Sequence, residues 1–132
     1  MPVDESLVGR EFSPTPALEV TTTGVAAFAD ALGTTYDGQI PPTYPIVLAF
    51  DAMNAFLAAE QIDLFRIIHG EQRFAYERPI VVGDELTATL SVASLRQIGG
   101  NDIIGTRSEI RDAGGDLVCT TTATLVHRGG EL

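Results

Sequence analysis

The sequence predicts an α+β fold in which an antiparallel β-sheet wraps one long buried helix. Three observations support this prediction: an apolar run over residues 46–59, a change to alternating apolar and polar residues after Gln61, and turn-forming segments between the alternating runs. The chain has 132 residues, and 45% of them are hydrophobic, which fits one domain with its own core. We therefore expect a single domain over residues 1–132.

The run from Ile46 to Ala59 is apolar on nearly every side of a helix. Such a helix must be buried, and at this length it is too short to cross a membrane. Its interior polar residues, Asp51 and Asn54, are three positions apart and therefore share a face. We interpret that face as reaching solvent, a loop or a partner. Pro45 suits the first turn of the helix.

A shorter helix is expected nearer the N-terminus. Leu18–Val20 fits a short strand, and either Thr22 or Thr23 is a suitable cap for a helix that ends near Gly33. Residues 34–43 are rich in turn formers and lack periodicity. This segment is therefore predicted to be a loop that leads into the long helix.

Four longer strands are expected in the second half of the chain. Apolar and polar residues alternate within residues 68–76, 86–92, 103–111 and 117–127. Short connections between successive strands require antiparallel pairing, although the pattern leaves the strand order open. One buried helix followed by a curved antiparallel sheet is best matched by the hot-dog fold. Cys119 lies in the last alternating run and is expected to be a small buried residue.

The charge balance restricts the partners. Eight arginines, no lysine and 18 acidic residues give a net charge of −10, which repels phosphate backbones and anionic lipid surfaces. We therefore expect no binding to nucleic acid or membranes, and nothing in the sequence directs the chain out of the cytoplasm. The single cysteine has no partner for an internal disulfide or a cysteine-based zinc site. We expect neither a metal nor a cofactor.

Several short motifs resemble those of MaoC-like dehydratases. Residues 68–74 read Ile-His-Gly-Glu-Gln-Arg-Phe, residues 77–86 read Glu-Arg-Pro-Ile-Val-Val-Gly-Asp-Glu-Leu, and Pro-Pro-Thr-Tyr at 41–44 precedes the long helix. Together with Val-Gly-Arg at 8–10, they resemble the N-terminal, non-catalytic, FAS1-type dehydratase-like unit of that family. Small actinobacterial subunits related to the mycobacterial 3-hydroxyacyl-ACP dehydratase are of this kind. The resemblance implies a hot-dog domain that handles acyl thioesters.

The same resemblance indicates that the catalytic dyad is missing. Catalytic members carry an Asp and a His in a Gly-Asp-x-Asn-Pro-x-His loop after the first helix, and these act as acid and base in enoyl-thioester hydration. The loop here reads Gly-Thr-Thr-Tyr-Asp-Gly, with Thr34 in place of the aspartate and no histidine after it. Asp37 lacks a histidine partner, and His127, near the end of the last strand, is interpreted as a surface residue. We expect no catalytic residue in this chain.

The predicted function is that of a non-catalytic or accessory subunit of an (R)-specific enoyl-thioester hydratase or 3-hydroxyacyl dehydratase, a lyase of fatty acid or lipid metabolism. The subunit would line the acyl tunnel beside a catalytic MaoC-like chain. The implied partners are acyl-CoA or acyl-ACP and a second hot-dog chain, in a homodimer or a heterodimer. The candidate substrate-binding residues are Pro42, Thr43, Asp51, Asn54, His69, Gly70, Arg73 and Arg78.

Some of these residues also have structural explanations. His69 could cap a backbone group, stack against the helix or hydrogen-bond Glu71, and Gly70 could let the strand approach the helix closely. For the two arginines the suggested role is functional: Arg73 or Arg78 could help to bind the phosphates of CoA or ACP. Two alternative functions stay open: a stand-alone acyl-CoA thioesterase in which Asp51 activates water, and a non-enzymatic acyl-thioester-binding domain.

Overall fold

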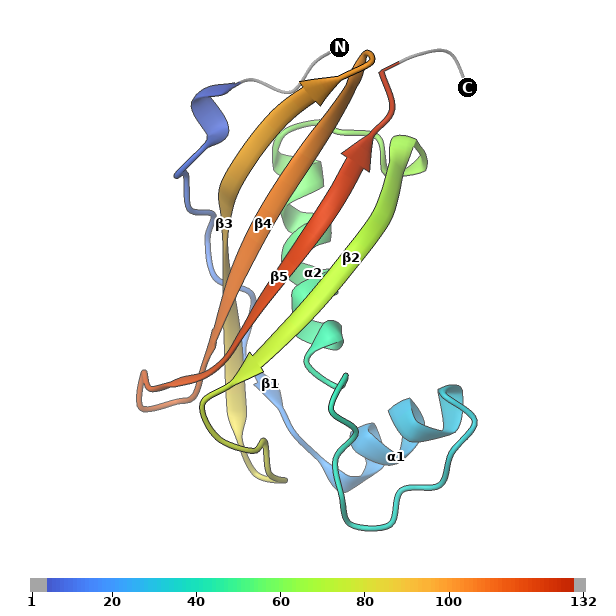
Figure 1. Ribbon diagram of the computed structural model, residues 1–132. Helices are drawn as coiled ribbons and strands as arrows, with labels where there is room; N and C mark the ends of the chain where they lie inside the picture. Colours follow the sequence, from blue (N-terminus) through green and yellow to red (C-terminus); the bar gives the residue numbers. More distant parts are fainter. Residues whose placement is uncertain (1–4, 130–132) are drawn as a thin grey trace.

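A five-stranded antiparallel sheet curves around the long helix in the computed structural model, which describes residues 5–129 (Figure 1). The helices are α1 (Thr22–Ala31) and α2 (Ile46–Ala59), with short 3-10 turns η1 (Glu5–Leu7) and η2 (Leu64–Arg66). The strands are β1 (Leu18–Glu19), β2 (Ile67–Tyr76), β3 (Glu85–Ile98), β4 (Asn101–Arg111) and β5 (Leu117–His127). This arrangement is the hot-dog fold that the sequence predicts.

The strand order places β2 at an edge of the sheet. The order is β1-β3-β4-β5-β2, so β2 pairs with β5 and not with β3, which follows it in the chain. The pairing is irregular at Gly70 in β2 and at Ala93 in β3, and such bulges bend a strand and increase its twist. The sheet therefore curves, and one edge of β2 has no strand partner within residues 5–129.

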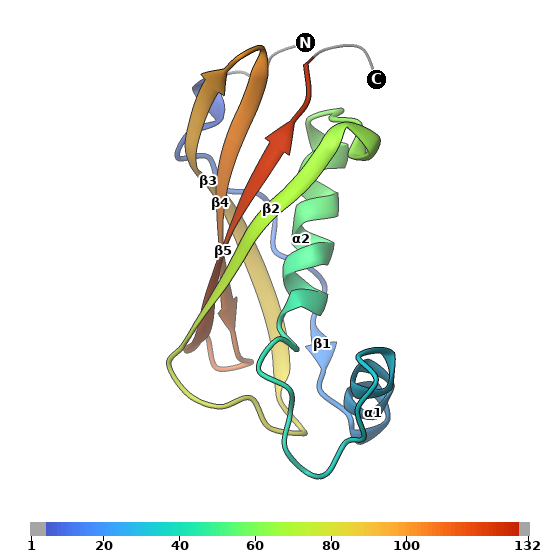
Figure 2. The same cartoon turned by 45° about the vertical axis from the view of Figure 1, so that its right-hand side comes forward.

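The core lies between α2 and the concave face of the sheet (Figure 2). Phe56 of α2 is fully buried and meets Phe12 edge to face, with ring centroids 5.0 Å apart. Cys119 is buried as expected, whereas Asp51 and Asn54 lie on the exposed face of α2. None of the helices within residues 5–129 is long and apolar enough to span a membrane.

The short helix α1 begins one residue earlier than expected. Its N-cap is Thr21, whose hydroxyl accepts a hydrogen bond of 3.0 Å from the Gly24 backbone N–H. At the other end, the Thr34 hydroxyl and backbone N–H both donate to the Ala29 carbonyl. These side chains satisfy backbone groups that a helix terminus would otherwise leave unpaired. They therefore fix both ends of α1, the helix that precedes the loop into α2.

His127 is buried, so its interpretation as a surface residue is wrong. Its side chain is 7% exposed, and its Nδ1 lies 3.1 Å from Oδ2 of Asp102, which is 3% exposed. Alternation along β5 puts His127 on the same side as the buried Leu125, and the register places it opposite Asp102 on β4. Burial of the imidazole is acceptable because a carboxylate partner accompanies it.

Candidate functional site

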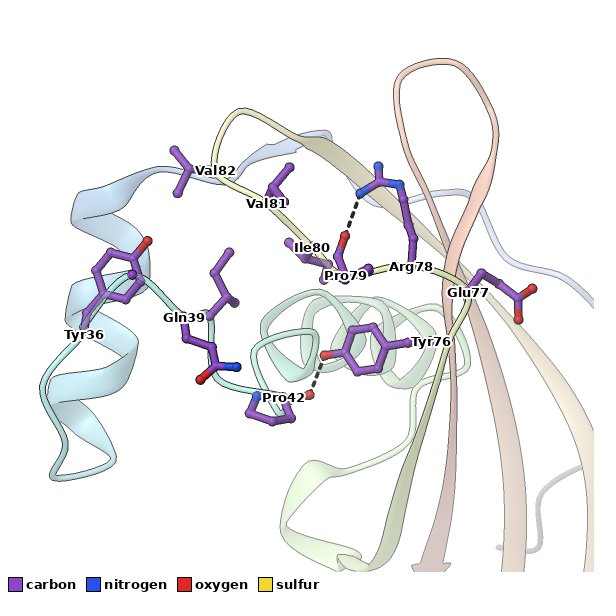
Figure 3. A pocket seen from close by; sticks show the side chains of 12 residues that line it. Tyr36, Gln39, Pro42, Tyr76, Glu77, Arg78, Pro79, Ile80, Val81 and Val82 are labelled. Atoms are coloured by element: carbon purple, nitrogen blue, oxygen red, sulfur yellow. Dashed lines mark hydrogen bonds between the residues drawn. The ribbon is translucent and has the colours of Figure 1, made fainter.

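A pocket of about 750 Å³ lies where the α1–α2 loop faces the connection from β2 to β3 (Figure 3). Its walls are mainly apolar, with Tyr36 on the α1–α2 loop and Tyr76 at the end of β2 on facing sides. The lining residues are Tyr36, Gly38, Gln39, Ile40, Pro42, Tyr76, Glu77, Arg78, Pro79, Ile80, Val81 and Val82. A concave, mostly apolar site with a few polar groups is typical of small-ligand binding.

A hydrogen bond joins the two walls of this pocket. The hydroxyl of Tyr76 donates to the carbonyl of Pro42, in the segment that enters α2. Burial, together with the nearby Cys119 thiol, raises the pKa of Tyr76 to about 12. Near neutral pH the phenol is therefore a hydrogen-bond donor and not a base. On the same segment, Tyr44 packs edge to face on Phe28 of α1, which holds the loop wall in place.

Arg78 fixes the opposite rim through a pair of carboxylates. Its Nη1 lies 2.9 Å from Asp84 Oδ2 and its Nη2 3.1 Å from Asp84 Oδ1, while Nη2 also lies 3.2 Å from Asp112 Oδ2. Hydrogen bonds from Arg78 hold the pKa of Asp84 below its usual value. The pKa of Asp112 is lowered by the Asp116 backbone N–H and then by Arg78. The guanidinium thus ties the β2–β3 connection to the β4–β5 turn.

Arg78→Met is expected to lower the free energy of unfolding by about 1–2 kcal/mol at neutral pH, allowing for the partial exposure of the guanidinium. Carboxyls with lowered pKa values stabilise the fold above their unfolded pKa of about 4, and this stabilisation is lost as pH falls through their folded pKa. The difference between wild type and Arg78→Met should therefore shrink from pH 7 to pH 3. Urea unfolding at both pH values measures it.

Arg73→Met is a matched control for this experiment. Arg73 is 74% exposed and, among the described residues, has one carboxylate partner, Glu71, at 2.6 Å, so its replacement should change stability by only a few tenths of a kcal/mol. A difference between wild type and Arg78→Met that stays constant from pH 7 to pH 3 would contradict the carboxylate pairing.

The loop that resembles the family's catalytic loop carries no acid–base pair in this structure. Thr34 terminates α1, as described above, and the Asp37 carboxylate accepts from the Gln39 backbone N–H at 3.2 Å in a local turn. The ionisable residues among the lining residues are two tyrosines, Glu77 and Arg78. Figure 3 shows the Glu77 side chain pointing away from the pocket. The pocket walls that residues 5–129 form are therefore better suited to binding a ligand than to general acid–base catalysis on it.

The predicted site residues do not all meet at this pocket. Pro42 and Arg78 line it. His69 instead stacks on Phe50 of α2, with ring centroids 6.4 Å apart and an interplanar angle of 18°, which confirms the stacking interpretation. A Cβ on Gly70 would meet the Thr124 carbonyl at 3.5 Å and no atom of α2 within 4 Å. The interpretation that Gly70 allows close approach to the helix is wrong, because this glycine lies at the bulge in β2.

The other predicted residues lie on exposed surface. Arg73 is on β2 and pairs with Glu71, and Thr43 is exposed just before α2. Asp51 and Asn54 point outward from α2. Their proposed contacts with an acyl thioester therefore depend on a second chain that would cover this surface.

Seven apolar or aromatic lining residues were not predicted from the sequence. They are Tyr36, Ile40, Tyr76, Pro79, Ile80, Val81 and Val82. The signal that could have found them is an apolar run in a turn-forming connection: Val81 and Val82 are 54% and 44% exposed. Apolar side chains kept in water at one place commonly mark a binding surface.

Comparison with known proteins agrees with the fold. A family model described as the FAS1-like dehydratase domain region matches residues 36–121. A UPF0336 protein of Streptomyces griseus is 34% identical, and the match covers 99% of each chain. A crystal structure of the C-terminally truncated HadBC (3R-hydroxyacyl-ACP dehydratase) complex from Mycobacterium tuberculosis is 25% identical, with a TM-score of 0.79, over 96% of this chain and 99% of that one.

A structure described as a MaoC-like dehydratase is also 25% identical, with a TM-score of 0.76, and this chain covers 43% of it. These matches define a hot-dog protein of the MaoC-like dehydratase type. Within that class, the chain belongs to the UPF0336 family of small actinobacterial proteins.

Proposed function

We propose that this chain is a non-catalytic or accessory subunit of an (R)-specific enoyl-thioester hydratase or 3-hydroxyacyl dehydratase, and that residues 1–132 form its single hot-dog domain. The observation that carries the proposal is the pocket of about 750 Å³, whose lining includes no carboxylate–histidine pair within residues 5–129. Hydration and dehydration need a general base and a general acid. A second chain must therefore supply them, while this chain lines the acyl tunnel.

The surface beside β2 supports the need for a second chain. Large exposed apolar side chains gather on β2, on η2 just before it and on α2, whose Phe50 packs on β2 through His69. They are Phe50, Leu64, Phe65, Ile68 and Tyr76. An unpaired strand edge flanked by apolar surface is a place where another strand can pair. We propose that a catalytic MaoC-like chain occupies it, in a cytoplasmic heterodimer that acts on acyl-CoA or acyl-ACP.

The candidate residues take defined places in this arrangement. Pro42 and Thr43 lie at the entrance to α2, near the pocket, and Asp51 and Asn54 face the partner from α2. Arg73, on the outer edge, is better placed than the carboxylate-bound Arg78 to meet a phosphate of the carrier, because its partner Glu71 is itself half exposed.

A reconstitution assay tests the proposal. The hydration of crotonyl and longer enoyl-CoA would be measured with this chain alone, with a co-expressed MaoC-like chain alone, and with the two mixed. We expect this chain alone to be inactive and the mixture to exceed the catalytic chain alone. Turnover by this chain alone would overturn the accessory role. Hydrolysis of acyl-CoA that is lost in Asp51→Ala would instead favour the thioesterase.

A further inference from the structure

The 3-10 turn η2 presents an aromatic side chain to solvent just before the free edge strand. Phe65 is 86% exposed, and its neighbour Leu64 is 50% exposed. Large apolar side chains exposed at one place commonly mark a contact surface, and aromatic residues often contribute most to the affinity of a protein interface. Phe65 is therefore a candidate contact residue, and its place in the fold indicates what it would contact.

Hydrogen bonds hold the backbone of η2 in position. The Asp63 carboxylate accepts from the Phe65 backbone N–H at 2.9 Å. The Arg128 backbone N–H, just after β5, donates to the Arg66 carbonyl at 2.8 Å, and Arg66 Nη1 donates to the Arg128 carbonyl at 3.1 Å. These contacts fasten the turn to the end of the sheet, so a partner would meet Phe65 on a segment that is already ordered.

Phe65 lies far from the pocket of its own chain. The turn η2 precedes β2, whereas the pocket lies beyond the other end of this strand (Figure 1). Ten residues form β2. Because a strand rises about 3.3 Å per residue, Phe65 and the pocket are about 30 Å apart. A pocket of this kind that Phe65 contacts must therefore belong to another chain.

Pairing at the free edge would bring Phe65 to such a pocket. Two like chains pair about a twofold or near-twofold axis, which makes their paired edge strands antiparallel. If all ten residues of β2 pair, position 67 lies opposite position 76 of the partner strand, and position 65 therefore lies opposite position 78. Residues 76–82 line the pocket in this chain. We expect the corresponding pocket at the same end of the partner strand, because MaoC-like proteins share this fold.

We infer that Phe65 covers the acyl pocket of the catalytic chain and thereby sets the length of acyl chain that the complex prefers. This inference rests on the proposed function, which supplies the catalytic partner at the β2 edge. In this chain the corresponding pocket has an exposed apolar rim, because Val81 and Val82 are 54% and 44% exposed. An acyl chain against such a rim keeps part of its surface in water. A phenyl ring over the chain would bury that surface, and the gain grows with each CH₂ group covered.

The dependence of KM on chain length tests the inference. KM and kcat would be measured for trans-2-dodecenoyl-CoA and crotonyl-CoA, with the catalytic chain saturated by wild type or by Phe65→Ala. We expect Phe65→Ala to raise KM for dodecenoyl-CoA about tenfold with little change in kcat. KM for crotonyl-CoA should rise much less, because crotonyl ends one carbon beyond its double bond. Ile98→Ala is the matched control: its side chain is 55% exposed at the end of β3, and both KM values should stay unchanged.

A fluorescent label provides a second measurement. Cys119 is fully buried, so a thiol-reactive, polarity-sensitive dye attaches selectively to the new thiol of Phe65→Cys. Addition of the catalytic chain should shift the dye emission to shorter wavelength, because the dye leaves water. An emission that the catalytic chain leaves unchanged would overturn the inference. A shift that develops with the concentration of the labelled chain alone would also overturn it, because a second copy would then cover position 65.

Failure of this inference is distinguishable from failure of the proposed function. Suppose that crotonyl-CoA hydration depends on both chains and that Phe65→Ala leaves the ratio of the two KM values unchanged. The role of Phe65 would then be overturned, and the accessory role would stand. Hydration that gains nothing from this chain, at either substrate length, would overturn both.

Discussion

Replacement of Phe56 with alanine is expected to lower the free energy of unfolding by about 3–5 kcal/mol. The ring is fully buried between α2 and the sheet, where it meets Phe12, and removal of it would leave a cavity that a curved sheet cannot close. Domains of this size are typically stable by about 5–15 kcal/mol, so the variant would retain little stability. Urea unfolding followed by circular dichroism measures the loss.

Phe65→Ala is the control for this prediction. It makes the same chemical change at a side chain that is 86% exposed, and its effect on the isolated chain should stay within about 0.5 kcal/mol. Equal unfolding midpoints for Phe56→Ala and Phe65→Ala would mean that α2 is not the centre of the core.

Ile68→Glu is expected to reduce partner-dependent hydration by about 30-fold at subsaturating concentration, the effect of losing about 2 kcal/mol of association free energy. Ile68 lies on the free edge strand and is 51% exposed. A carboxylate there opposes edge-to-edge pairing because pairing would remove it from water. Titration of the variant into the catalytic chain measures the shift.

Ile98→Glu provides the comparison. Ile98 is 55% exposed and ends β3, on the side of the sheet away from β2 (Figure 1). Its replacement should leave the titration unchanged. If both variants weaken activity equally, the partner does not pair with β2.

Local patterns were sufficient for the elements of this fold. The helix over Ile46–Ala59 was predicted with the bounds that the structure has, because an all-apolar run of that length allows few alternatives. Strand order was not predictable in the same way, since the pairing of β2 with β5 joins segments about fifty residues apart. His127 was misjudged for a similar reason: its partner Asp102 is 25 positions away.

The site was less predictable than the fold. Motifs that resemble the family located Pro42 and Arg78, but the pocket is built from two connections without periodicity, residues 36–42 and 76–82. Whether side chains from such loops face one another depends on the tertiary structure. The meaning of Gly70 was also unpredictable from the sequence, because a bulge is a property of two paired strands.

Tyr76 belongs both to the surface that is proposed to bind a partner and to the pocket. It ends the free edge strand, and its hydroxyl holds the carbonyl of Pro42 on the other wall. Any partner that changes the position of this ring on pairing with β2 changes the width of the pocket. Thermodynamic linkage then requires the reverse: a ligand that favours one position of Tyr76 changes the affinity of the edge for its partner by the same factor. Assembly and ligand binding would then be thermodynamically coupled through the position of the Tyr76 ring.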